Sequence, residues 1–157
     1  MLHIDAVPKS VFSWGCNLYL DDAPLLSFDM AWVSNQGSFQ WEGVDYTLYR
    51  QSPWFGGFVV SDGSGIFARA TKDSAFLRAF TVHLGDREFR LAAASPLSRR
   101  FVLKEGENTV GGIDPAFVFS RRCRGEFPDE LPIPVCVFLF WLVVLMWRRQ
   151  STAAVGS

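Results

Sequence analysis

The sequence predicts a mainly β fold: a closed antiparallel β-barrel of about twelve strands, threaded by one C-terminal hydrophobic α-helix. Residues 10–122 alternate apolar and polar side chains with a period of two, which is typical of strands that bury one face. Turn-forming residues interrupt this pattern every roughly 8–13 residues, as in a meandering sheet. The stretch 135–147 is apolar on every side, so it must lie in a protein core or a bilayer.

Four rows of alternating side chains define the clearest strands. Each row places apolar residues on one face and polar residues on the other, as the pleat of a strand requires. The rows cover residues 26–32, 39–48, 89–93 and 101–103. Gly, Pro, Asn and Asp mark the turns between strands, which we expect at 21–24, 35–37, 42–43, 62–63, 85–86, 95–96 and 105–108.

The apolar stretch has the length and shape of a filling for this barrel. About twelve strands enclose more space than their own side chains fill, and a helix is about 10–12 Å across. We expect the helix at about 133–149, in a single domain of residues 1–150, followed by a flexible tail at 151–157. Side chains expected in the core are Val137, Phe138, Phe140, Trp141, Val144 and Leu145.

Both ends of the predicted helix carry suitable residues. Pro132 and Pro134 fit its start, where the first N–H groups have no partner within the helix. Arg148 and Arg149 fit a last turn, where cations meet the negative end of the helix dipole.

The alternative is a tail-anchored membrane protein, with residues 132–147 as its single transmembrane helix. About 13 residues of this stretch are apolar without interruption, whereas a spanning helix needs about 20. Basic residues flank the stretch on both sides, so charge does not orient it. Length therefore favours the barrel interpretation.

Composition narrows the function further. The net charge of −1 does not suit a protein that coats nucleic acid. Three cysteines without a CxxC spacing predict no disulfide framework and a reducing compartment. The N-terminus shows no signal-peptide pattern, so we expect a cytoplasmic protein, peripheral to the membrane if it is membrane-bound.

Candidate catalytic and metal-binding residues are few. Asp86 could orient His83 as a general base, but a strand histidine facing solvent is the simpler interpretation. Ser64 lies between glycines without the spacing of a nucleophile elbow. Cys16, Cys123 and the two histidines offer no local pair for a metal. The sequence therefore predicts no enzyme activity, no cofactor and no metal.

Basic pairs are the remaining candidate binding residues. Each arginine near an anionic lipid surface contributes about 1 kcal/mol. The candidates for anionic-headgroup contacts are Arg99, Arg100, Arg121, Arg122 and Arg124. Because residues 121–124 precede the helix and 148–149 follow it, we expect these two clusters at opposite mouths of the barrel. A solvated rim is the simpler alternative role for them.

Aromatic residues at 53–55 suggest a second feature of a barrel mouth. Pro53, Trp54 and Phe55 lie in a turn-like stretch, where they would cap the mouth or enter a membrane. Capping is the favoured interpretation, because barrel ends must be closed against water.

Three patterns, in order along the chain, carry a resemblance to a known family. They are the Asp-Gly hairpin at 55–65, the Arg-Phe segment at 98–103 with Gly-Gly-Ile at 111–113, and the ending from Phe127-Pro128 to Trp147-Arg148-Arg149. The chain resembles the Tubby C-terminal-like superfamily, which includes phospholipid scramblases and LURP-one-related proteins, and in particular its small bacterial members without an assigned role. The resemblance covers about residues 10–149.

The resemblance implies a twelve-stranded barrel around a hydrophobic helix and binding close to membranes. It assigns no binding residue, because the basic residues with which Tubby domains bind phosphoinositides have no clear counterparts here. Scramblases carry an acidic calcium segment near the terminal helix, where this chain has only Asp129 and Glu130. Two carboxylates are too few for the roughly 6–8 oxygen ligands of calcium.

The expected partners are anionic phospholipid headgroups or a membrane surface. No nucleic acid and no particular protein partner is indicated. We expect a monomer, because a closed barrel leaves no sheet edge for a neighbour.

Overall fold

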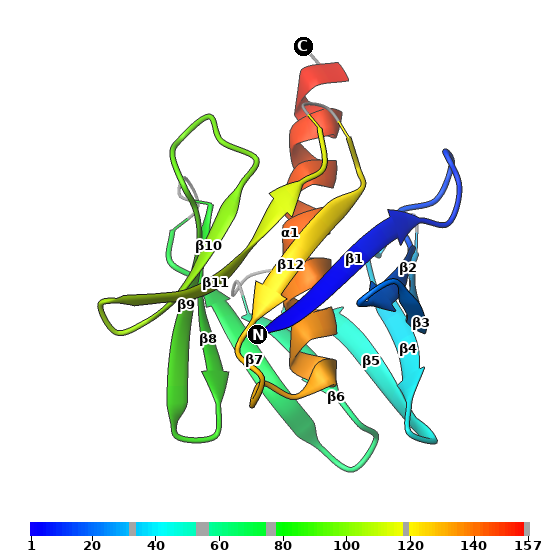
Figure 1. The fold of residues 1–157 in the computed structure, drawn as a ribbon, viewed down its shortest axis with the longest axis vertical. Helices are drawn as coiled ribbons and strands as arrows, with labels where there is room; N and C mark the ends of the chain where they lie inside the picture. Colours follow the sequence, from blue (N-terminus) through cyan, green and yellow to red (C-terminus); the bar gives the residue numbers. More distant parts are fainter. Residues whose placement is uncertain (32–33, 53–56, 75–77, 118–119, 156–157) are drawn as a thin grey trace.

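The computed structural model describes residues 1–31, 34–52, 57–74, 78–117 and 120–155, which form one closed barrel around a helix (Figure 1). The strands are β1 (Leu2–Pro8), β2 (Cys16–Leu20), β3 (Ala23–Met30), β4 (Gly37–Trp41), β5 (Val44–Arg50), β6 (Gly57–Ser61), β7 (Ile66–Lys72), β8 (Ala79–Leu84), β9 (Arg87–Ala93), β10 (Phe101–Glu105), β11 (Asn108–Pro115) and β12 (Cys123–Phe127). The helix is α1 (Ile133–Val155). The predicted fold class is confirmed.

Every strand pairs antiparallel with its neighbours in sequence, and β1 closes the barrel by pairing with both β2 and β12. In the closing pair Asp5 lies opposite Arg124 and Ala6 opposite Cys123. Closure leaves no strand edge unpaired. Successive connections therefore alternate between the two ends of the barrel.

The two ends differ in the length of their connections. The turn end holds the short connections 21–22, 42–43, 62–65, 85–86 and 106–107, and the segment 128–132 that leads into α1. Asp21 and Asp22, and likewise Glu42 and Gly43, have positive φ angles, which two-residue hairpin turns of type I′ require. The loop end holds the longer connections 9–15, 31–36, 51–56, 73–78, 94–100 and 116–122.

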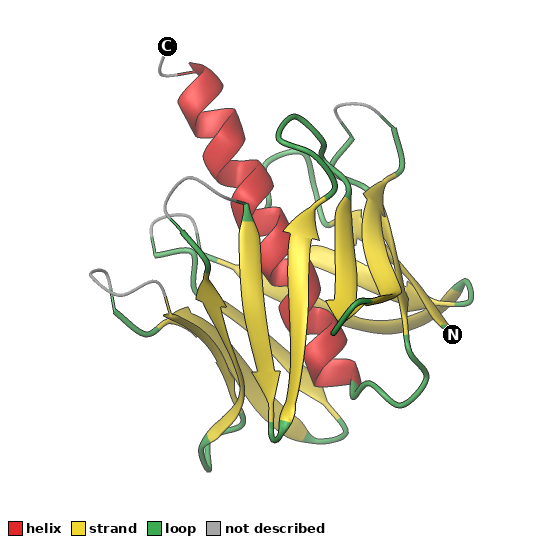
Figure 2. Ribbon diagram, turned by 90° about the vertical axis from the view of Figure 1, so that its left-hand side faces the viewer, coloured by secondary structure: helices red, strands yellow, loops and turns green. Residues whose placement is uncertain are grey.

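The helix α1 runs through the barrel from the turn end to the loop end, and its last part extends beyond the strands (Figure 2). Every residue from Val135 to Trp147 is at most 3% exposed. This includes all the side chains predicted for the core, Val137, Phe138, Phe140, Trp141, Val144 and Leu145.

The buried helix bears on the membrane alternative. The segment Ile133–Ser151 is long and apolar enough to cross a bilayer, but most of it is buried inside the barrel. In this structure its apolar side chains contact strands from all directions, which leaves no apolar face for lipid.

The predicted end of the helix at about 149, with a tail from 151, is wrong, because α1 continues to Val155. No proline or glycine interrupts the chain before Gly156, and Ala153 and Ala154 have high helix propensity. Arg148 and Arg149 therefore lie within the helix and not in its last turn. The start agrees with the prediction, since the carbonyl oxygen of Pro132 accepts hydrogen bonds from the first turn.

Close contact between β12 and α1 fixes how the helix sits. Phe127 and Phe140 meet edge to face, with ring centroids 5.5 Å apart. Gly125 of β12 has no room for a side chain, because an added Cβ would lie 2.5 Å from the Phe127 ring and 2.6 Å from the Phe140 ring. The glycine therefore allows two large aromatic rings to pack at the same height of the barrel.

We predict that Gly125→Ala lowers the free energy of unfolding by about 1–3 kcal/mol, because overpacking forces these rings out of place. Gly65→Ala is the matched control, since no atom lies within 4 Å of a Cβ added there. Denaturant unfolding of both variants measures the difference. Equal stability of the two variants would contradict the packing described here.

Candidate functional site

Charged residues separate along the barrel axis, which the net charge of −1 conceals. The connections of the turn end, all described, contain eight acidic and no basic residues: Asp21, Asp22, Glu42, Asp62, Asp86, Glu107, Asp129 and Glu130. The sequence of the loop-end connections contains one acidic residue, Asp73, and six basic ones: Lys9, Arg78, Arg99, Arg100, Arg121 and Arg122. Arg148 and Arg149 of α1 join the loop end. The barrel thus has one acidic and one basic end.

The expectation that residues 121–124 and 148–149 lie at opposite mouths is wrong. Strand β12 and the segment 128–132 return the chain across the full height of the barrel before α1 begins. The helix then crosses back, so both clusters reach the loop end (Figure 1). The contacts agree, since the Arg148 Nη1 donates to the carbonyl oxygen of Ala31, in the loop end, at 2.9 Å.

Two arginines connect three neighbouring loops, 9–15, 94–100 and 116–122, which we call the braced platform. Arg121 donates to the carbonyl oxygens of Ser13 (2.6 Å) and Ser10 (2.9 Å), across from its own loop. Arg99 donates to the carbonyl oxygen of Ser120 at 2.6 Å. Hydrogen bonds from charged donors are among the stronger ones in proteins, so these loops hold one another in place.

Tryptophan rings support both bracing arginines. The Arg121 guanidinium lies 5.2 Å from the Trp14 ring, and that of Arg99 lies 4.5 Å from the Trp147 ring of α1. Trp147 Nε1 also donates to the carbonyl oxygen of Arg99 at 3.1 Å. Burial lowers the pKa of Arg99. The platform is therefore attached to the helix as well as to the strands.

The second arginine of each pair faces outward. Arg100 is exposed and pairs with Asp114 at 2.9 Å, and Arg122 is exposed. Among the described residues, the guanidinium of Arg122 makes no hydrogen bond or ion pair. Of the five predicted headgroup contacts, Arg100 and Arg122 are thus accessible on the platform, whereas Arg99 and Arg121 brace the loops.

Arg124 lies lower, on the outer face of β12. It pairs with Asp5 at 2.9 Å, and the hydrogen bond to that carboxylate raises the pKa of the guanidinium. This pairing satisfies Arg124 within the barrel wall and leaves it a minor contributor to the loop end.

Sequence reasoning missed a second basic group at the loop end, the Phe58 cation cluster of Arg50, Lys72 and Arg149. The guanidinium groups of Arg50 and Arg149 lie 6.0 Å and 5.8 Å from the same Phe58 ring. Burial, with added repulsion from Arg149 and Arg50, lowers the pKa of Lys72. Burial and the charge of Arg50 likewise lower the pKa of Arg149. The available signal was weak: β5 and β7 each end on a basic residue next to a loop-end connection.

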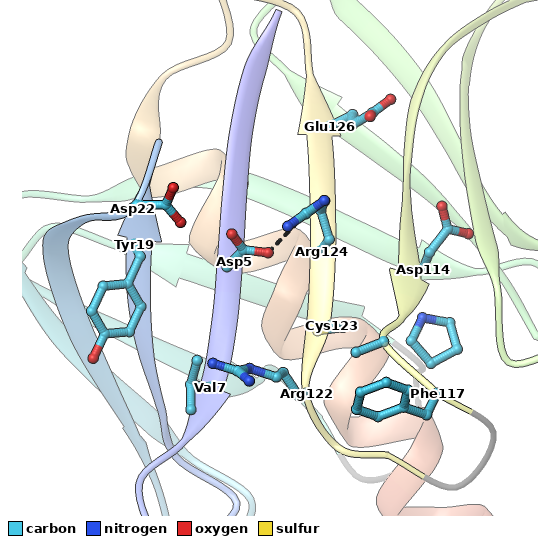
Figure 3. Close-up of a pocket in the computed structure, with 12 residues that line it drawn as sticks. Asp5, Val7, Tyr19, Asp22, Asp114, Phe117, Arg122, Cys123, Arg124 and Glu126 are labelled. Atoms are coloured by element: carbon cyan, nitrogen blue, oxygen red, sulfur yellow. Dashed lines mark hydrogen bonds and ion pairs between the residues drawn. The ribbon is translucent and has the colours of Figure 1, made fainter.

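A groove of about 650 Å³ runs along the outer face of β12, below the platform (Figure 3). Tyr19 lies at one side and Phe117 at the other, with the pair of Asp5 and Arg124 between them. Most charges lining the groove pair with each other or with a neighbour. Among the described residues, Asp22 and Arg122 have no such partner, and Arg122 lies at the end of the groove nearest the loops (Figure 3).

The candidate catalytic residues do not assemble. His83 is exposed on β8, and Ser64 donates its backbone and hydroxyl hydrogens to the Asp62 carboxylate within a turn. In the part of the chain that the structure describes, no three His, Cys, Asp or Glu side chains come together as metal ligands. Pro53, Trp54 and Phe55 lie outside the described residues, as does Trp32.

Comparison with protein-family models, with curated proteins and with solved structures gives no match for this chain. The loop end is therefore interpreted from its own geometry. Its braced platform and its cation cluster, facing the same direction, can bind an anionic surface or group.

The three cysteines are free and buried, which makes them poor nucleophiles. Burial raises the pKa of Cys16 and Cys136 to about 12. It also raises the pKa of Cys123 well above its ordinary value. We predict that a thiol-alkylating reagent leaves all three unmodified in the folded protein and modifies them after unfolding, as mass spectrometry would show.

The same shifts predict a pH dependence. The thiols stay protonated in the folded protein but ionise near 9.0 when unfolded, so the free energy of unfolding falls as pH rises above about 9. The Cys16→Ala variant should lose part of this slope in denaturant titrations at increasing pH. An unchanged slope would mean that Cys16 does not contribute to it.

Proposed function

We propose that this protein is a non-catalytic β-barrel scaffold that binds anionic lipid surfaces through its loop end. The observation that carries the proposal is the separation of charge along the barrel axis. An anionic surface attracts the basic loop end and repels the acidic turn end, so a chain with almost no net charge still binds in one orientation.

The number of cations at the loop end supports binding to a surface. Arg100 and Arg122 on the platform and the Phe58 cation cluster lie on different sections of the same rim. Basic residues near an anionic membrane contribute about 1 kcal/mol each within a Debye length of about 8 Å. Several of them together give useful affinity, which salt weakens.

The Phe58 cation cluster supports the same proposal. Arg50 and Arg149 both lie beside the Phe58 ring, and the charge of each disfavours the charged form of Lys72. Three cations gathered at one section of the rim add to the attraction of the loop end for a lipid phosphate.

We further propose that the chain is a Tubby C-terminal-like protein, on its three sequence patterns and on a twelve-stranded barrel that encloses a hydrophobic helix. This assignment fits a cytoplasmic, monomeric protein that associates peripherally with membranes. The anionic-surface proposal does not depend on it, since it uses only the residues of the loop end.

We predict that Arg100→Gln with Arg122→Gln weakens binding to anionic vesicles by about 2 kcal/mol, or about 30-fold, because two surface charges are lost. The control for net charge is Arg69→Gln with Lys104→Gln, two exposed residues on strands. Co-flotation with vesicles of phosphatidylcholine, with and without phosphatidylglycerol, measures both variants. Equal flotation of the wild-type protein with neutral and anionic vesicles would refute the proposal.

A further inference from the structure

The braced platform carries large apolar side chains in full contact with water. Phe12 is 77% exposed, Leu97 is 95% exposed and Phe117 is 71% exposed. One belongs to each of the three loops, 9–15, 94–100 and 116–122. Large apolar side chains in such positions mark a surface that binds a protein or a membrane when they lie together.

The three loops lie together because of the strand order. Around the barrel the strands follow as β2, β1, β12, β11, β10 and β9. Loop 9–15 joins β1 to β2, loop 116–122 joins β11 to β12, and loop 94–100 joins β9 to β10. The three apolar side chains therefore occupy consecutive loops of one side of the rim. Arg99 and Arg121 brace these loops, so the side chains are presented without a large loss of loop entropy on binding.

Cations accompany two of these three apolar side chains. Arg100 shares a loop with Leu97, and Arg122 shares both a loop and the groove with Phe117. Alternation of apolar and basic side chains on one face is the arrangement of proteins that lie in a membrane interface, where apolar groups pass below the headgroups and cations meet the phosphates.

We infer that the platform inserts Phe12, Leu97 and Phe117 below the headgroups of an anionic bilayer, with the axis of α1 pointing toward the membrane. The inference rests on the proposed function and adds the depth and orientation of binding. It selects a bilayer over a soluble partner because basic residues extend around the rim beyond the platform, to Arg50 and Arg149, as a broad surface requires.

Insertion makes part of the affinity independent of salt. Charge attraction weakens as salt rises, whereas burial of apolar side chains does not. A protein held by both contributions should keep measurable binding to anionic vesicles at a salt concentration that removes the effect of Arg100 and Arg122.

The test compares the triple variant Phe12→Ser, Leu97→Ser and Phe117→Ser with a control of Val44→Ser and Ile66→Ser. The control residues are also exposed, at 38% and 45%, but they begin strands at the turn end. We expect the triple variant to bind anionic vesicles about tenfold more weakly or worse, with an unchanged melting temperature. The control should bind within about twofold of the wild-type protein.

Depth is measured with a fluorescent label, which the buried native thiols permit. An environment-sensitive dye on Leu97→Cys should shift to shorter wavelength with anionic vesicles and be quenched by lipid-borne quenchers. The same dye on Ile66→Cys should not change.

The outcomes separate the two proposals. If the wild-type protein floats with anionic vesicles but the dye at position 97 stays in water, insertion is wrong and surface binding stands. If the protein does not float with them at all, both are wrong. If the dye at position 66 enters the lipid instead, the orientation is wrong.

Discussion

The packing of α1 inside the barrel is the constraint on which the rest of the structure depends. Twelve strands enclose a wide interior, and protein interiors tolerate almost no empty space. A helix that contacts strands in every direction must be apolar in every direction, as residues 135–147 are. Gly125 shows how close the fit is, since it removes a side chain where the Phe140 ring needs the room.

The direction of this helix also decides what the loop end contains. Because α1 starts at the turn end, its basic residues emerge among the long loops, where Trp147 supports Arg99 and Arg149 joins the Phe58 cation cluster. The filling of the core and the basic rim are thus two consequences of one chain direction. The acidic residues lie in the short turns at the other end. These turns are exposed to solvent, and Asp21, Asp22 and Glu42 have the positive φ angles of type I′ turns.

Much of the fold was predictable because its signals are local. The period of two in rows such as 89–93, and the Gly and Asp residues at turns, indicate strands and hairpins without knowledge of their partners. The apolar stretch likewise indicated a helix that lies inside. Its C-terminal boundary was mispredicted because Arg148 and Arg149 resemble a helix end, whereas nothing in residues 150–155 stops the helix.

The sequence by itself determined that strands would form, that they would connect by short turns, and that one apolar helix would fill the space between them. The tertiary structure alone decided which arginines brace loops and which face outward, and that Arg50 and Arg149 lie beside the same Phe58 ring. The physical reason is that side-chain alternation acts over a few residues, whereas these groupings arise from antiparallel winding, which brings together residues as far apart in the chain as Arg121 and Ser10.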